Sequence, residues 1–309
     1  METLRERDVE HGIAVAAPAA AVYDLVRDVT RWPVIFAPTV HVRHLARDER
    51  GERFQIWAVA GDGVLTWTSR REFEPSAVAF RQERSQPPVA SMGGRWEFRD
   101  SAEGSEVLLR HRFAATEEEA VGWIEQTLDR NSEAELAGLR RIAELGVPLD
   151  QACFTFEDSV EIAGSAADAY RFIDEADRWP DLLPHVRRVD LVETAPGIQR
   201  LEMDTVTKDG DTHTTSSVRV CFPDELIVYK QVLPPALLIG HSGQWSFRPT
   251  ATGATVTATH TVLIDPAAVA GVLGASATLQ DARAFARKAL GGNSLTTLAH
   301  AKEFAEAAR

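Results

Sequence analysis

The stretch that decides the fold is YDLVRDVTRWP at residues 23–33, and it returns in altered form as YRFIDEADRWP at residues 170–180. The two tryptophans, Trp32 and Trp179, are 147 residues apart. The repeats of solenoid proteins are only about 20–50 residues long, so a unit of this length is a whole domain. The chain is therefore predicted to be a duplication of one domain.

Later matches continue the duplication at a slightly larger distance. The segment Gly94–Phe98 returns as Gly243–Phe247, and His111 returns as His260, both 149 residues later. Small insertions and deletions therefore separate the two copies. Because the copies can be compared with each other, a residue kept in only one of them is a candidate for function.

Length and composition fit two ordinary domains, which we place at residues 1–148 and 149–309. The net charge of −13 argues against nucleic acid or an anionic membrane surface as a partner. Two cysteines, Cys153 and Cys221, suggest neither a disulfide framework nor a metal cluster, and favour a cytoplasmic location. The sequence shows no signal peptide, no membrane-spanning run, no phosphate-binding glycine loop and no metal-binding histidine motif, so neither cofactor nor metal is expected.

Hydrophobic periodicity predicts the same order of elements in each copy. In the first copy, Val9–Val15 is typical of a strand and Ala19–Arg27 of a helix. About six strand-like runs follow between residues 39 and 114, and a long amphipathic helix runs from a capping box at Thr116 to a stop at Gly146. This order predicts an α+β helix-grip fold, in which a curved antiparallel sheet surrounds a long C-terminal helix and encloses a cavity.

The second copy is expected to follow this order from Thr155 to the C-terminus. Its terminal helix contains Gly271, Gly274 and the pair Gly291-Gly292, so we expect this helix to be broken.

One strand of the first copy carries an unusual inward face. Alternate residues of a strand share a face, so Trp67, Ser69, Arg71 and Phe73 lie together, opposite a polar set that suits solvent. A buried arginine is costly unless it has a partner or a purpose. Arg71 either pairs with an acidic side chain or snorkels to the rim, or it is a fixed cation that binds an anionic, ketone or enolate oxygen.

Other polar and aromatic residues have two interpretations each. His111 shares a face with apolar neighbours, as does His260, and is either a hydrogen-bonded core residue or a proton-transfer group. Trp32 and Trp96 belong to the core or to a cavity wall. Asn131, on the long helix, either lines the cavity or caps a helix irregularity.

The duplicated helix-grip unit, the Trp-Pro pair, the strand at residues 67–73 and the helical segment Asp129–Ser132 together resemble the di-domain aromatase/cyclases of bacterial type II polyketide synthases. These belong to the START and Bet v 1-like superfamily of polyketide cyclases and dehydrases. The resemblance implies a poly-β-ketone substrate, C9-reduced and held on an acyl carrier protein. It implies C7–C12 aldol closure of the first ring and its dehydration without a cofactor, alongside a ketosynthase and a ketoreductase.

The resemblance also implies that Trp67, Ser69, Arg71 and Trp32 are pocket residues, and the residue patterns add the others. We predict that Arg71 anchors the developing oxyanion, that Ser69 donates a hydrogen bond, and that His111 transfers protons. The predicted substrate-binding residues are Trp32, Trp67, Trp96, Phe73 and Asn131.

Comparison of the copies assigns the chemistry to the first. At the distances of 147 and 149 residues, Arg71 falls on valine, and Arg219 is predicted to face outward because its phase is opposite to that of Phe222. The second pocket is then a structural partner, or performs a later dehydration with His260, His241 or His213. The alternative function, from a different class, is a non-catalytic carrier of a hydrophobic ligand.

Overall fold

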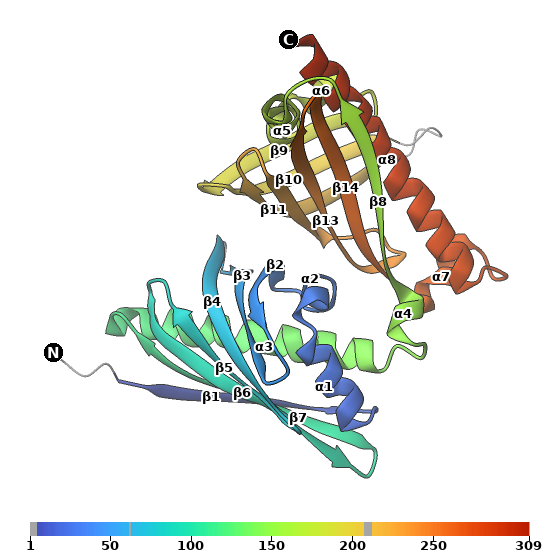
Figure 1. Ribbon diagram of the computed structural model, residues 1–309. Helices are drawn as coiled ribbons and strands as arrows, with labels where there is room; N and C mark the ends of the chain where they lie inside the picture. Colours follow the sequence, from blue (N-terminus) through green and yellow to red (C-terminus); the bar gives the residue numbers. More distant parts are fainter. Residues whose placement is uncertain (1–4, 62, 207–211, 309) are drawn as a thin grey trace. The chain divides into compact units, whose positions relative to one another are not determined.

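The computed structural model describes residues 5–61, 63–206 and 212–308. It divides into two compact units, Met1–Gly146 and Val147–Arg309, with the division two residues before the position that we expected. Each unit holds a seven-stranded antiparallel sheet and a long C-terminal helix (Figure 1). The predicted α+β helix-grip fold is confirmed in both units.

The N-terminal unit begins with an edge strand and two short helices. These are β1 (Arg7–Val15), α1 (Ala19–Arg27) and α2 (Trp32–Ile35). The remaining strands form a meander: β2 (Thr39–Arg47), β3 (Gly51–Ala60), β4 (Gly63–Glu74), β5 (Ala77–Arg84), β6 (Val89–Ser101) and β7 (Gly104–Ala115). The sheet order is β1-β7-β6-β5-β4-β3-β2, because β1 pairs with the last strand of the meander.

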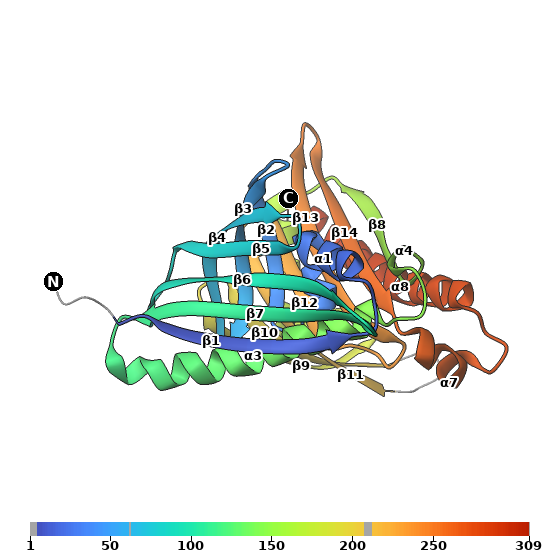
Figure 2. The ribbon, with the colours of Figure 1, turned by 90° about the horizontal axis from the view of Figure 1, so that it is seen from below.

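The long helix α3 (Val121–Ala143) packs along β1 and β7, as Figure 2 shows. Its apolar face joins Phe113 of β7 in a buried cluster through Val121, Ile124 and Leu128. The predicted capping box at Thr116 is not formed: the Thr116 hydroxyl donates to the carbonyl of Pro88, and the helix starts one turn later.

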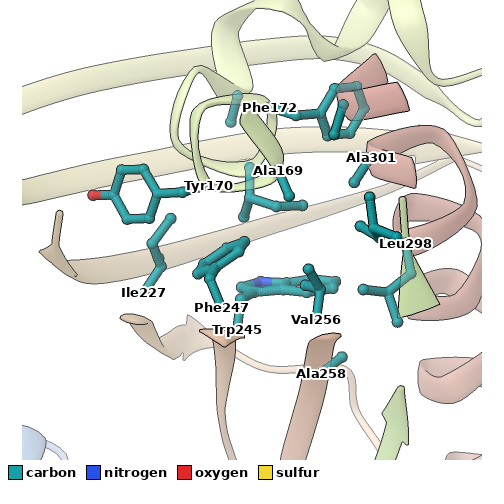
Figure 3. Close-up of a cluster of buried hydrophobic side chains, with 14 of the residues drawn as sticks. Ala169, Tyr170, Phe172, Ile227, Trp245, Phe247, Val256, Ala258, Leu298 and Ala301 are labelled. Carbon is teal, nitrogen blue, oxygen red and sulfur yellow. The ribbon is translucent and has the colours of Figure 1, made fainter. Parts of the chain in front are cut away.

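The C-terminal unit repeats the plan after the short helix α4 (Leu149–Ala152). Its elements are β8 (Cys153–Ile162), α5 (Ala166–Asp174), α6 (Trp179–Leu182), β9 (Val186–Ala195), β10 (Ile198–Val206), β11 (Thr212–Phe222), β12 (Leu226–Leu233), β13 (Leu238–Thr250) and β14 (Gly253–Ile264). Figure 3 shows the core of this unit, in which Trp245 and Phe247 of β13 face Tyr170 of α5 and Leu298 of the terminal helix.

The terminal helix is interrupted as predicted, but only at the first of the two glycine sites. Helix α7 (Val269–Leu273) ends at Gly274, whose φ of 102° suits glycine, and α8 (Leu279–Ala307) begins after a capping box between Thr278 and Asp281. Gly291 and Gly292 lie inside α8 and do not break it. Among the described residues, no helix has both the length and the apolar character needed to cross a membrane.

Candidate active site

Arg71 lies in the interior of the N-terminal unit, where its side chain is 1% exposed. Its Nε and Nη2 donate to the same oxygen of Glu52, at 2.8 and 2.5 Å. Strand pairing causes this contact, because Glu52 of β3 and Arg71 of β4 are direct partners in the ladder. Burial lowers the pKa of Arg71 to about 10, against the opposing effect of Glu52, so the guanidinium stays charged at neutral pH.

The remaining donors of Arg71 bind the C-terminal end of helix α1. Nη1 donates to the carbonyl of Val26 at 2.7 Å, and Nη2 donates to that of Arg27 at 2.8 Å. The last carbonyls of a helix lack partners within the helix and carry partial negative charge, so a cation stabilises them. Arg71 therefore fixes the end of α1 to the sheet.

Aromatic rings enclose this guanidinium. Its Cζ lies 4.9 Å from the ring centroid of Trp32, 5.6 Å from that of Phe54 and 5.5 Å from that of Phe73. The Trp32 indole donates to the carbonyl of Val26, which also accepts from Arg71. These contacts place Trp32 and Phe73 around the ion pair, and they match the interpretation in which Arg71 pairs with an acidic side chain.

The second unit keeps the buried arginine, which corrects our prediction that Arg219 faces outward. Arg219 is 3% exposed, and its Nη2 donates to the carbonyl of Ile173 at 2.6 Å, at the end of α5. On the following strand, Arg219 pairs with Tyr229 as Arg71 pairs with Phe80. The two arginines are thus equivalent at a distance of 148 residues, between the two distances that we had used.

The prediction for Arg219 was wrong because we took Phe222 to mark the inward face of the strand. Phe222 lies at the end of β11 and is only half-buried, whereas Cys221, two residues from Arg219, belongs to the core. Ser217 and Arg219 therefore repeat Ser69 and Arg71. An inward arginine is not unique to the first copy, so it gives no ground for assigning the chemistry to that copy.

The residue that pairs with the buried arginine on the preceding strand is acidic in the first unit and an amide in the second. Gln199 pairs with Arg219 in the ladder where Glu52 pairs with Arg71. The Gln199 amide donates to Asp174 of α5 at 3.1 Å. Glu52 was missed by the sequence analysis, although its alternation with Phe54 and Ile56 on one strand face marks it as inward.

A pocket lies elsewhere in the N-terminal unit, between α3 and the sheet. It is partly open to solvent. Its apolar wall includes Trp67, Leu65, Val89, Met92, Ile124 and Leu128. Its polar residues are Thr66, Gln82, Gln86, Thr127 and Asn131. An apolar cavity with a few polar groups is the usual form of a small-molecule site.

The structure separates the predicted site residues into groups. Trp67 and Asn131 line the pocket, and the Asn131 amide donates to the carbonyl of Val59 at 2.9 Å. Trp96 is a core residue stacked between Phe36 and Phe98. Trp32, Phe73 and Arg71 form the ion-pair cluster described above and are not among the residues that line the pocket.

Ser69 lies on β4 between these two groups. Its side chain is buried, and its strand partners are Phe54 on β3 and Gln82 on β5, the second of which lines the pocket. A register shift between Thr68 and Ser69 in the pairing with β5 marks the same place. Ser69 thus lies on β4 between Arg71, in the ion-pair cluster, and Trp67, in the pocket wall.

His111 is buried on β7 against the edge of the Phe80 ring, with 5.3 Å between ring centroids. Gly94, its strand partner, makes this approach possible, since a Cβ there would lie 2.5 Å from Phe80. Burial, with a smaller effect of His11, lowers the pKa of His111 to about 4, so the imidazole is neutral at pH 7. Its Nδ1 has no hydrogen-bond partner among the described residues.

The equivalent histidine of the second unit belongs to a hydrogen-bonded network. His260 Nδ1 lies 3.0 Å from His241 Nε2 and 3.1 Å from the Tyr229 hydroxyl, and its Nε2 lies 2.7 Å from Ser294 Oγ. His241 Nδ1 in turn lies 2.9 Å from the Gln231 side chain. Two of the three histidines that the sequence analysis named for this unit, His260 and His241, thus meet, while the side chain of His213 lies outside the described part of the chain.

Comparison with known proteins follows the duplication. The family model described as "Polyketide cyclase / dehydrase and lipid transport" matches residues 6–144 and again residues 154–306. The chain is 52% identical over 305 residues to the granaticin polyketide synthase bifunctional cyclase/dehydratase of Streptomyces violaceoruber, covering 97% of this chain and 94% of that protein. It is 50% identical over 308 residues to the actinorhodin counterpart of Streptomyces coelicolor, covering 96% of each.

Solved structures of di-domain proteins match the chain over both units. The di-domain aromatase/cyclase BexL matches with a TM-score of 0.82 and 47% identity, over 97% of this chain and 99% of that chain. StfQ, a di-domain aromatase/cyclase from the steffimycin pathway, matches with a TM-score of 0.77 and 37% identity, over 96% of this chain and 98% of that chain. The chain therefore belongs to the polyketide cyclase/dehydrase family, as a di-domain aromatase/cyclase, and is an enzyme of the bifunctional cyclase/dehydratase type.

Proposed function

We propose that the pocket of the N-terminal unit closes and aromatises the first ring of a poly-β-ketone, between C7 and C12 of a C9-reduced chain. The observation that carries the proposal is the pocket itself, an apolar space between α3 and the sheet with Trp67 and Asn131 in its wall. The relatives named above are cyclase/dehydratases of granaticin and actinorhodin synthases, which supports a substrate of this class.

The reaction is an aldol addition followed by loss of water. A methylene carbon loses a proton to give an enolate, which forms a carbon–carbon bond to a ketone carbon; the resulting alkoxide takes up a proton. Elimination of that hydroxyl and of the C9 hydroxyl, each with a neighbouring proton, releases two molecules of water, and enolisation of the remaining ring ketone gives the aromatic ring. A confined apolar pocket holds the two carbons together, and this supplies the proximity that the closure needs.

This proposal assigns proton transfer to His111, which is buried beside Phe80 and is not among the residues that line the pocket. Burial lowers its pKa to about 4, so the imidazole is neutral at pH 7 and has a nitrogen lone pair that can accept a proton, although it is a weaker base than an exposed histidine. Its Nδ1 has no partner among the described residues, whereas His260 has partners at both ring nitrogens. This difference is the ground for placing the chemistry in the N-terminal unit, now that both units are known to hold a buried arginine.

Arg71 is assigned a different role from the oxyanion anchor that we predicted for it. All three of its nitrogens donate to Glu52 or to the end of α1, and its side chain is 1% exposed. It is therefore a positioning residue in this proposal, which fixes α1 and β4 behind the pocket. Ser69 remains the proposed hydrogen-bond donor, because it is the buried polar residue on β4 between Arg71 and Trp67.

The substrate would reach this cytoplasmic enzyme on an acyl carrier protein, with a ketosynthase and a ketoreductase of the same synthase as further partners. The names of the two relatives, which assign both to polyketide synthases, support this.

Reconstitution tests the proposal. The full-length protein is added to a purified ketosynthase, ketoreductase and acyl carrier protein, and the products are identified by mass spectrometry and NMR. We expect one C7–C12 aromatic product with the ketoreductase present, in place of the mixture formed without the cyclase. A carrier, the alternative function, would bind the product and leave the mixture unchanged.

A further inference from the structure

Three residues of α3 form a row along the pocket of the N-terminal unit. Trp123, Thr127 and Asn131 are four positions apart, so they lie on one face of the helix, and all three line the pocket. Trp123 is 39% exposed, whereas Thr127 is 9% exposed. Thr127 therefore lines the pocket with a side chain that is nearly closed to solvent.

The Thr127 hydroxyl has no hydrogen-bond partner among the described residues, and its oxygen is buried. A buried threonine within a helix can donate to the carbonyl four residues earlier. In α8 the hydroxyls of Thr296 and Thr297 do this, with the carbonyls of Gly292 and Asn293 at 3.0 and 3.1 Å. Because a buried polar group without a partner destabilises a fold, Thr127 needs an explanation of another kind.

Three other polar residues of the pocket have protein partners. The Asn131 amide donates to the Val59 carbonyl, and Thr66 accepts from Gln55. Gln82 accepts a hydrogen bond from Ser85 at 2.7 Å. The fifth polar residue, Gln86, is exposed. Thr127 thus combines burial, a place in the pocket wall and an unused hydroxyl.

We propose that the Thr127 hydroxyl binds an oxygen of the ligand in this pocket, a ketone, enol or phenol oxygen of a polyketide chain, and so fixes how the chain lies along α3. This inference rests on the proposed function of the pocket and adds a residue that determines orientation. The hydroxyl can donate to a ketone oxygen or accept from an enol, so it suits both the open chain and the aromatised ring.

A substituted threonine separates this role from a structural one. Thr127→Val keeps the branched shape and removes the hydroxyl, so the free protein loses an unsatisfied polar group. We expect its melting temperature to stay constant or to rise by about 1–4 °C. Ligand binding is expected to weaken by about 5- to 20-fold, and Thr127→Ser should restore it to within about twofold.

The matched control is Thr297→Val in α8. The Thr297 hydroxyl is buried and bonded to Asn293, so its removal should lower the melting temperature of the protein and leave binding in the other unit unchanged.

The experiment titrates each full-length variant with 1,8-dihydroxyanthraquinone, a stable polyphenolic ketone, and follows quenching of tryptophan fluorescence, since Trp67 and Trp123 line the pocket. Weaker binding by Thr127→Val with an unchanged or higher melting temperature supports the inference. Wild-type binding by Thr127→Val, or a melting temperature lowered as in Thr297→Val, overturns it. The first-ring product of the reconstituted synthase is measured separately: if probe binding depends on Thr127 while wild-type protein leaves the product mixture unchanged, the cyclase proposal fails and the assignment of Thr127 stands.

Discussion

Arg71 donates two hydrogen bonds to one oxygen of Glu52 in the interior of the N-terminal unit, and both side chains are at most 1% exposed. A buried ion pair of this kind brings little net stability compared with an apolar pair, but removing one partner leaves an uncompensated charge. The pair therefore fixes the end of α1 to the sheet, because the same guanidinium also binds the carbonyls of Val26 and Arg27.

The ion pair predicts that substitutions of Glu52 and Arg71 have coupled effects on the free energy of unfolding. Glu52→Ala is expected to lower the free energy of unfolding by about 3–5 kcal/mol, since it leaves the Arg71 charge buried and unpaired. Arg71→Ala should cost a similar amount, and the double substitution should cost less than the sum of the two. Denaturant titration of the four proteins measures this; additive losses would show that the two side chains do not interact.

Trp67 predicts an effect on product rather than on stability. It lines the pocket and is only half-buried, so Trp67→Ala removes part of the pocket wall against which the proposed polyketide would fold. We expect a fall of about tenfold or more in the first-ring product, with the shunt products of uncatalysed closure taking its place. Trp96→Phe, a change in the core, should lower the melting temperature and leave the product distribution unchanged. A wild-type product profile for Trp67→Ala would remove Trp67 from the site.

Buried histidines predict a loss of stability in mild acid. Burial lowers the pKa of His41, His111 and His260 to about 4, and that of His241 to about 3, against an ordinary value of 6.5. Between these values the unfolded chain binds protons that the folded chain does not, so the four histidines lower the free energy of unfolding as the pH decreases from 6.5 to 4, and Glu135, whose pKa burial raises from 4.5 to about 7, opposes one of them.

Denaturant titrations at pH 7, 6 and 5 check this pH dependence. The free energy of unfolding should decrease at each step, and His111→Gln should decrease less steeply because one of the four groups is gone. Equal stability at pH 7 and pH 5 would contradict the pKa values on which the prediction rests.

Much of the fold could be predicted because its elements are amphipathic with the period of their own secondary structure. The alternation in β4 correctly placed Ser69 and Arg71 in the interior, and the helical spacing in α3 placed Ile124 and Leu128 against the sheet. The inward position of His111 followed from the same argument.

The partners of these residues were harder to predict, because they come from other elements. The carbonyls at the end of α1 that accept from Arg71 carry no side-chain signal. Glu52 does carry one, because its alternation with Phe54 marks it as inward, but the pattern does not show which residue it pairs with. The prediction for Arg219 was wrong because a shift of one residue moves a strand side chain to the opposite face of the sheet. Arg71 and Arg219 are 148 residues apart, whereas we compared the copies at distances of 147 and 149.

The central claim is that the first ring closes in the N-terminal unit, with His111 as the proton-transfer residue. Its most direct test compares His111→Gln and His260→Gln, substitutions at equivalent positions of the two units, in the reconstituted synthase. We predict that His111→Gln reduces formation of the first-ring product by about 100-fold or more, while the protein remains folded. His260→Gln should disturb its network with His241 and Ser294, lower the melting temperature, and leave the rate of the first-ring product within a few-fold of wild type. A first-ring rate lost in His260→Gln and kept in His111→Gln would contradict the account.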